Sequence, residues 1–211
     1  MDDRIERARL LYEQAVFGGD AGAVDAADRV LDEVEADLAL ARGRVVHARF
    51  LQSGREDPRA LAMFERAAEL YRGLGNGRGE AEALFWVGTF HQVVRGDDAA
   101  AVPVLERSRS EAVRAGDDLT ASYALRHLGI AEHRAGRLDA ARERLEESTR
   151  IRRELGFLPG VAANLVGLAH ITAGEGRRDE ALALLDEARS VAEAAGAHGI
   201  VRHVEEARGR L

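Results

Sequence analysis

Histidine and glutamate are the side chains in this sequence that could bind a metal ion or transfer protons. The seven histidines do not form HExxH, in which two histidines on one helix face bind zinc. His133 and His170 could approach each other across neighbouring structural units, with Glu132 nearby. A metal site or small-molecule site there is one hypothesis, and ordinary surface histidines are the alternative that the sequence favours.

The sequence contains neither cysteine nor lysine. The absence of cysteine excludes disulfides, thiolate zinc sites and cysteine nucleophiles. The absence of lysine excludes a phosphate-loop lysine and Schiff-base chemistry. The glycines of "RGLGNGRGE" at 73–79 lack the GxGxxG spacing and a preceding strand, and they indicate a helix end and a turn. The sequence therefore predicts a protein that is not an enzyme and has no cofactor.

Composition indicates a helix-rich protein with an acidic balance. The chain has 211 residues, a net charge of −7 and 46% hydrophobic residues. The negative charge argues against direct binding to nucleic acid or to an anionic membrane. No apolar stretch is long enough to cross a bilayer, and the charged N-terminus is unlike a signal peptide. The expected location is the cytoplasm.

An internal repeat organises the whole sequence. Small residues recur at steps of 41, 40 and 40 residues, and large apolar residues follow each of them by four. The small residues are Ala60, Ala101, Ala141 and Ala181. Glycines at helix ends keep the same step, among them Gly116, Gly156 and Gly196. The period predicts an all-α fold of about five antiparallel helix pairs, forming a single repeat domain over 1–211.

The predicted helix pairs are joined by short turns rich in glycine and aspartate. A C-terminal capping helix follows the last pair at 199–210. The pairs span approximately 3–37, 39–74, 79–115, 119–155 and 160–195, and the first pair divides into helices at 3–17 and 21–37. The second pair begins with a helix at 39–53. One unit has an extra residue between Gly88 and Gly96.

This pattern resembles the tetratricopeptide repeat (TPR) family. The closest match is Leu128-Gly129 followed by Gly136, Ala141, Leu145 and Ser148. The period of about 40 residues is longer than the usual 34, and it is similar to that of the long-helix repeats of bacterial regulators and scaffolds. The resemblance implies a right-handed α-solenoid. It also implies a concave groove, lined by the first helix of each pair, that binds a peptide or a partner protein.

The helix faces expected to line this groove give the candidate partner-binding residues. The apolar floor is expected at Trp86 and Phe90, with basic residues flanking it, and Arg126 is the best candidate for holding a carboxylate. The full set is Arg49, Trp86, Phe90, Tyr123, Arg126, Ile130, His133, Arg134, Asn164 and His170.

The sequence leaves alternatives open for several of these residues. Phe85 and Trp86 point about 100° apart on a helix, so one of them should lie in the core. For Arg126 and Arg134, the sequence favours the alternative that each is an ordinary solvated or salt-bridged surface residue. For the whole protein, the leading hypothesis is a non-catalytic interaction module, and a regulatory role is a further hypothesis. The alternative is a self-associating scaffold that forms a homodimer.

Overall fold

The computed structural model describes residues 2–210, which form ten α-helices and one π-helix and include no strand. The predicted all-α solenoid is confirmed. Met1 and Leu211, the ends of the predicted domain, lie outside the described residues. Contacts divide the chain into two compact units, one ending at Ala115 and one beginning at Gly116. The single domain therefore stays a prediction, and the two units are described separately.

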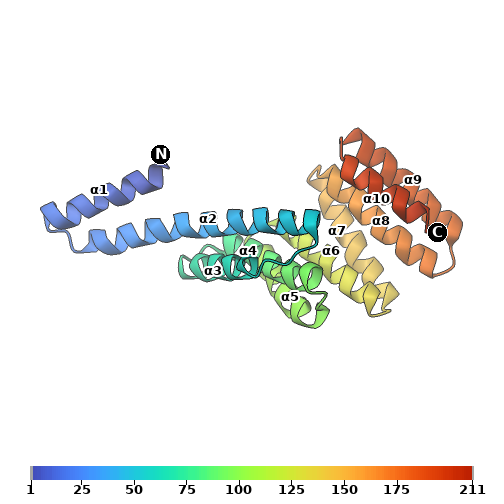
Figure 1. Cartoon of the computed structure of the whole chain (residues 1–211), viewed down its shortest axis with the longest axis horizontal. Helices are drawn as coiled ribbons and strands as arrows, with labels where there is room; N and C mark the ends of the chain where they lie inside the picture. Colours follow the sequence, from blue (N-terminus) through green and yellow to red (C-terminus); the bar gives the residue numbers. More distant parts are fainter. Residues whose placement is uncertain (1, 211) are drawn as a thin grey trace. The chain divides into compact units, whose positions relative to one another are not determined.

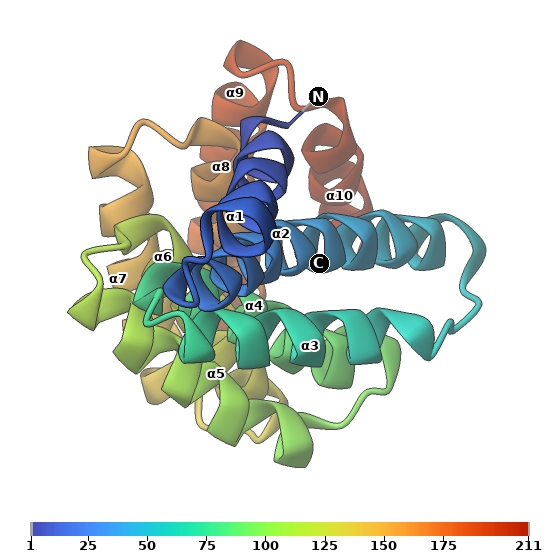
Figure 2. The same cartoon turned by 90° about the vertical axis from the view of Figure 1, so that its left-hand side faces the viewer.

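The first unit contains five α-helices and the π-helix (Figure 1). Its elements are α1 (Asp3–Gly18), α2 (Gly22–Ser53), α3 (Arg59–Gly73), α4 (Gly77–Thr89), η1 (Phe90–Val94) and α5 (Asp98–Arg114). Helices α1 and α3 both pack against α2 (Figures 1 and 2). Phe64 of α3, Leu84 of α4 and Phe90 of η1 belong to the same buried core.

The predicted helix break between 37 and 39 is wrong, because α2 runs without interruption over 32 residues. The segment "LDEVEADLALAR" at 31–42 contains no glycine or proline and is rich in strong helix formers. Nothing in it ends a helix. The first two predicted pairs therefore share this one long helix, which packs against α1 and against α3.

The extra residue between Gly88 and Gly96 is accommodated by the π-helix. Residues Phe90–Val94 form a π-helix, in which each hydrogen bond spans one more residue than in an α-helix. The extra residue is absorbed in this turn, and Gly96 still ends the helix with φ 66°. The corresponding glycine in the next repeat is Gly136, which lies seven residues after Gly129. It has φ 75°, and the helix before it, α6, is a regular α-helix.

The second unit contains two regular helix pairs and a final helix. Its elements are α6 (Asp118–Arg134), α7 (Leu138–Glu154), α8 (Leu158–Gly174), α9 (Arg178–Ala194) and α10 (His198–Arg208). These bounds match the predicted ones to within two residues. Helices α6, α8 and α10 begin at 118, 158 and 198, so α10 occupies the position of a first helix in a further repeat.

Close contact between the two helices of a pair accounts for the glycines at 88 and 129. A Cβ atom added at Gly88 would lie 2.6 Å from Cγ of Leu105, and one added at Gly129 would lie 3.1 Å from Cγ of Leu145. Serines at equivalent positions bond the two helices of a pair. The Ser108 hydroxyl donates to the Ala81 carbonyl at 2.8 Å, and Ser148 donates to Ser122 at 2.7 Å.

Candidate functional site

The second unit contains a cavity of about 600 Å³ between the helices that begin successive repeats. Helices α6, α8 and α10 supply most of its wall, and Leu145 of α7 lies at its base. Ligand pockets in proteins commonly have volumes of this order. The polar and charged lining residues are Arg126, His133, Arg134, His170, His203, Glu206 and Arg210. Six of these seven side chains are basic, so the cavity suits an anionic ligand.

Arg126 is held rigidly in the cavity wall. Its Nη1 donates to the backbone carbonyl of Ala163 at 2.8 Å and to Oδ1 of Asn164 at 3.0 Å. Burial lowers the pKa of Arg126 to about 10, so the guanidinium remains charged at neutral pH. Within residues 2–210 it forms no ion pair with a carboxylate. Arg126 is thus an oriented cation whose charge is balanced only by neutral oxygens.

A second arginine lies behind Arg126 in the interior. Arg152 is only 1% exposed, and its Nη1 donates to Oδ1 of Asn164 and to the Gly160 carbonyl, both at 3.0 Å. Its guanidinium lies 4.9 Å from the ring centroid of Tyr123. Burial, and then the charge of Arg126, lower the pKa of Arg152 to about 9. One amide oxygen therefore accepts hydrogen bonds from two guanidinium groups, the buried one of Arg152 and the half-buried one of Arg126.

The amide of Asn164 is fixed on its other side as well. Its Nδ2 donates to the hydroxyl of Ser148 at 2.8 Å, and that hydroxyl donates onward to the Ser122 carbonyl. Asn164 is fully buried, so it positions Arg126 and does not itself line the cavity. Tyr123 likewise acts behind the wall, through its contact with Arg152.

Three histidines, His133, His170 and His203, line the cavity. His170 of α8 is half-buried, and burial lowers its pKa below the usual value, with further lowering by the charges of His133 and Arg210. His203 on α10 is exposed. Because positive charges already surround His170, an anion bound in the cavity would favour its protonated form.

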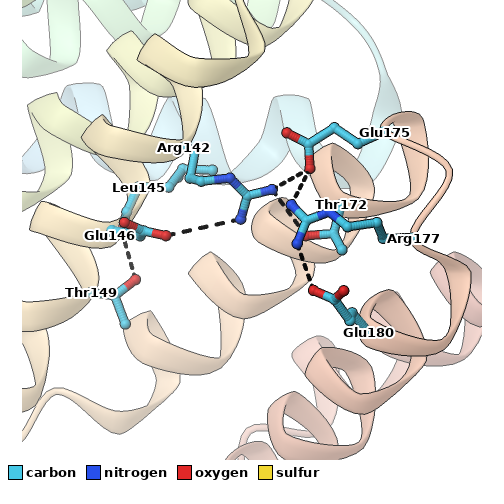
Figure 3. A network of polar contacts seen from close by, with 8 residues as sticks. All are labelled: Arg142, Leu145, Glu146, Thr149, Thr172, Glu175, Arg177 and Glu180. Atoms are coloured by element: carbon cyan, nitrogen blue, oxygen red, sulfur yellow. Dashed lines mark hydrogen bonds and ion pairs between the residues drawn. The ribbon is translucent and has the colours of Figure 1, made fainter.

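A network of polar contacts links α7 to the end of α8 (Figure 3). Arg142 of α7 donates to the hydroxyl of Thr172 at 3.2 Å and to Glu175 at 2.5 Å, both at the end of α8. Glu175 also pairs with Arg177, which in turn pairs with Glu180 at the start of α9 (Figure 3). Arg142 does not line the cavity, so this network has a structural role.

The structure brings five of the predicted residues into one site. Arg126, Ile130, His133, Arg134 and His170 all line the cavity. The predicted set did not include the lining residues on and just after α10, which are His203, Glu206 and Arg210. The 40-residue period could have found two of them, since Glu206 follows Val166 by 40 and Arg210 follows His170 by 40.

The aromatic residues predicted for the groove lie in the first unit and contribute to its core. Phe90 is 1% exposed, so the expectation that it forms an accessible apolar floor is wrong. The π-helix places it in the core, with Arg95 4.9 Å from its ring centroid. Phe85 is also buried.

Trp86 is half-buried and packs on that core. Its ring is stacked on Phe64 at a centroid distance of 5.6 Å, and His47 lies edge-on at 5.3 Å. Both Phe85 and Trp86 therefore serve packing. Arg49 is exposed near the end of α2, beside a separate shallow hollow that includes Glu56 and Asp57.

The hypothesis of a metal site gains no support from this geometry. Among residues 2–210, no group of three or more histidine, aspartate or glutamate side chains is arranged to hold a metal ion. Glu132, the carboxylate proposed to assist His133, is ion-paired with Arg137. None of the described helices combines the length and the apolarity that a membrane span requires.

Comparison with known proteins supports the architecture. No family model matches the sequence, and no curated protein matches it. A crystal structure from Podosopora anserina, described as kinesin light chain nearly identical TPR-like repeats, matches with a TM-score of 0.55. The match has 17% sequence identity and covers 84% of this chain and 87% of that chain. This likeness shows that the chain has a TPR-like repeat fold.

Proposed function

We propose that the protein is a non-catalytic interaction module whose second unit binds an acidic segment of a partner protein. The observation that carries the proposal is Arg126, whose guanidinium is oriented by two hydrogen bonds and has no carboxylate partner among residues 2–210. It lies in the wall of a cavity lined by five other basic side chains. TPR-like repeats generally mediate protein–protein interactions, and an open groove of helices suits an extended segment.

The chemistry of the wall selects the ligand class. Arginine binds carboxylates through two parallel hydrogen bonds, and Arg126 is preoriented because Ala163 and Asn164 hold its Nη1. Ile130 and Val166 supply apolar surface between the charged groups. We therefore expect a segment that combines aspartate or glutamate with an apolar side chain.

Fluorescence anisotropy with labelled peptides tests this function. The probe is a short peptide of glutamate, aspartate and leucine, and its matched partner has glutamine and asparagine at the acidic positions. We expect only the acidic peptide to bind. The Arg126→Gln variant should weaken that binding by about tenfold to a hundredfold, because a charge-assisted hydrogen bond is worth roughly 1.5–3 kcal/mol.

Arg150→Gln is the control, because it also removes one arginine from the second unit. Arg150 is exposed on α7, pairs with Glu154, and does not line the cavity. This variant should bind the acidic peptide as the unchanged protein does. Equal binding of the neutral peptide, or unchanged affinity in Arg126→Gln, would remove the cavity as the acidic-segment site.

A further inference from the structure

Helix α2 carries a row of exposed apolar residues at an exact spacing of seven. Val24, Leu31, Leu38 and Val45 are each between 45% and 53% exposed. The intervening positions, three residues after each of these, are also apolar, and they are Ala27, Val34, Ala41 and Ala48. The row runs over most of the length of α2, and neither α1 nor α3 covers it.

This alternation of three-residue and four-residue steps is the pattern of a coiled-coil seam. A seven-residue repeat keeps one stripe of a helix facing a partner helix along its whole length. Four large residues alternate with mostly small ones, which allows close approach of a second helix. The geometry therefore fits a long helix better than it fits an extended peptide.

The distribution of charge along α2 indicates which helix is the partner of the apolar row. The N-terminal half, up to Asp37, carries six acidic residues and one arginine, whereas the half from Leu38 onward carries three arginines and no acidic residue. Each residue of the apolar row has a charged residue four positions later. These four are Asp28, Glu35, Arg42 and Arg49, two acidic and then two basic.

We propose that α2 pairs in an antiparallel orientation with α2 of a second copy of this chain. This orientation lays the acidic half of each helix against the basic half of the other, with Asp28 opposite Arg49 and Glu35 opposite Arg42 of the second copy. A parallel pair would place like charges together. The charges of α2 are therefore complementary to those of a second α2 only in the antiparallel orientation.

The flanking charges are available for such a contact. Neither Asp28 nor Arg42 forms an ion pair with any of the residues 2–210. Glu35 is bonded to Arg66 of α3 at 2.7 Å, and both side chains are about half exposed, so its carboxylate remains accessible to a second arginine. The twofold axis of the pair passes near Leu38, at the centre of the row.

The mass of the full chain in solution tests the pairing. Light scattering after size exclusion should give twice the chain mass of 22.9 kDa. The double variant Leu31→Glu, Leu38→Glu should be monomeric with unchanged helix content by circular dichroism. Val113→Glu is the matched control, because Val113 is 61% exposed on α5, outside the row, and this variant should stay dimeric. A monomeric unchanged protein, or a dimeric double variant, would overturn the proposal.

Single cysteines test the orientation, because the chain has no cysteine of its own. Leu38→Cys should form a disulfide-linked dimer on mild oxidation. Leu31→Cys and Ala48→Cys should each fail to crosslink alone and should crosslink when mixed, because the register that opposes Glu35 and Arg42 brings residue 31 of one copy near residue 48 of the other. Crosslinking of Leu31→Cys with itself would show a parallel pair and overturn the antiparallel arrangement.

Discussion

Asn164 joins two guanidinium cations in the second unit, one of them buried and the other half-buried. Its Oδ1 accepts hydrogen bonds from Arg126 and from Arg152, and no carboxylate pairs with either arginine within the described residues. A buried charge is costly unless it is paired. The positive charge that would attract a ligand is therefore retained at the expense of the free energy of folding.

Replacing Asn164 with aspartate should separate the effect of this cluster on ligand attraction from its effect on the free energy of folding. Asn164→Asp keeps the shape of the side chain and places a negative charge between the two guanidinium groups. We expect the free energy of unfolding to rise by about 1–3 kcal/mol, because both charges gain a partner. Affinity for the acidic peptide should fall. Urea unfolding and anisotropy on the same samples measure the two effects, and a loss of stability would contradict this account of the cluster.

His170 should make acidic-peptide binding depend on pH. Burial and neighbouring positive charges lower the pKa of His170 in the free protein, and a bound carboxylate raises it again. His170 therefore takes up protons when the peptide binds. The added affinity is complete below the pKa of His170 in the free protein, and it is lost as pH rises through the higher pKa of His170 in the complex.

Anisotropy titrations from pH 5 to pH 8 measure this dependence. We expect affinity to be higher at the acidic end of the range and the slope to be smaller in His170→Gln. Retention of the full slope in His170→Gln would show that the pH effect does not come from His170.

At the scale of the helix pair, packing depends on the glycine that faces a leucine. A methyl group at Gly88 would meet Leu105 at 2.6 Å, whereas a methyl group at Gly174, at the end of α8, would meet nothing within 4 Å. We expect Gly88→Ala to lower the free energy of unfolding by about 1–3 kcal/mol. Gly174→Ala should raise it by about 0.5–1 kcal/mol, because alanine favours helix more than glycine does. Chemical unfolding that shows equal effects would mean that Leu105 moves aside at little cost.

Helix α2 shows that a repeat unit can lose its turn and still fit the fold. The lack of a helix-breaking residue around Leu38 merges two predicted helices into one of 32 residues. The merged helix is longer than its neighbours, and its exposed apolar row follows from that length. The π-helix η1 shows the opposite case, in which an added residue is absorbed without a new turn.

At the scale of the whole molecule, charge is distributed unevenly. The net charge is −7, but the cavity of the second unit is lined mainly by basic side chains. Net charge therefore predicts poorly what this protein attracts. The two proposed surfaces lie in different units, the apolar row on α2 and the basic cavity among α6, α8 and α10, so the variants that test one leave the other intact.

The sequence alone determined the helix pairs from Gly77 onward, because glycines, small residues and large apolar residues recur at one period and each has a local structural effect. It also determined five residues of the cavity, since they share a helix face in successive repeats. Only the tertiary structure decided that Phe90 is buried, that Asn164 joins Arg126 to Arg152, and that α10 completes the cavity. These outcomes depend on contacts between residues distant in sequence, and a repeat period specifies equivalent positions without specifying which of them meet.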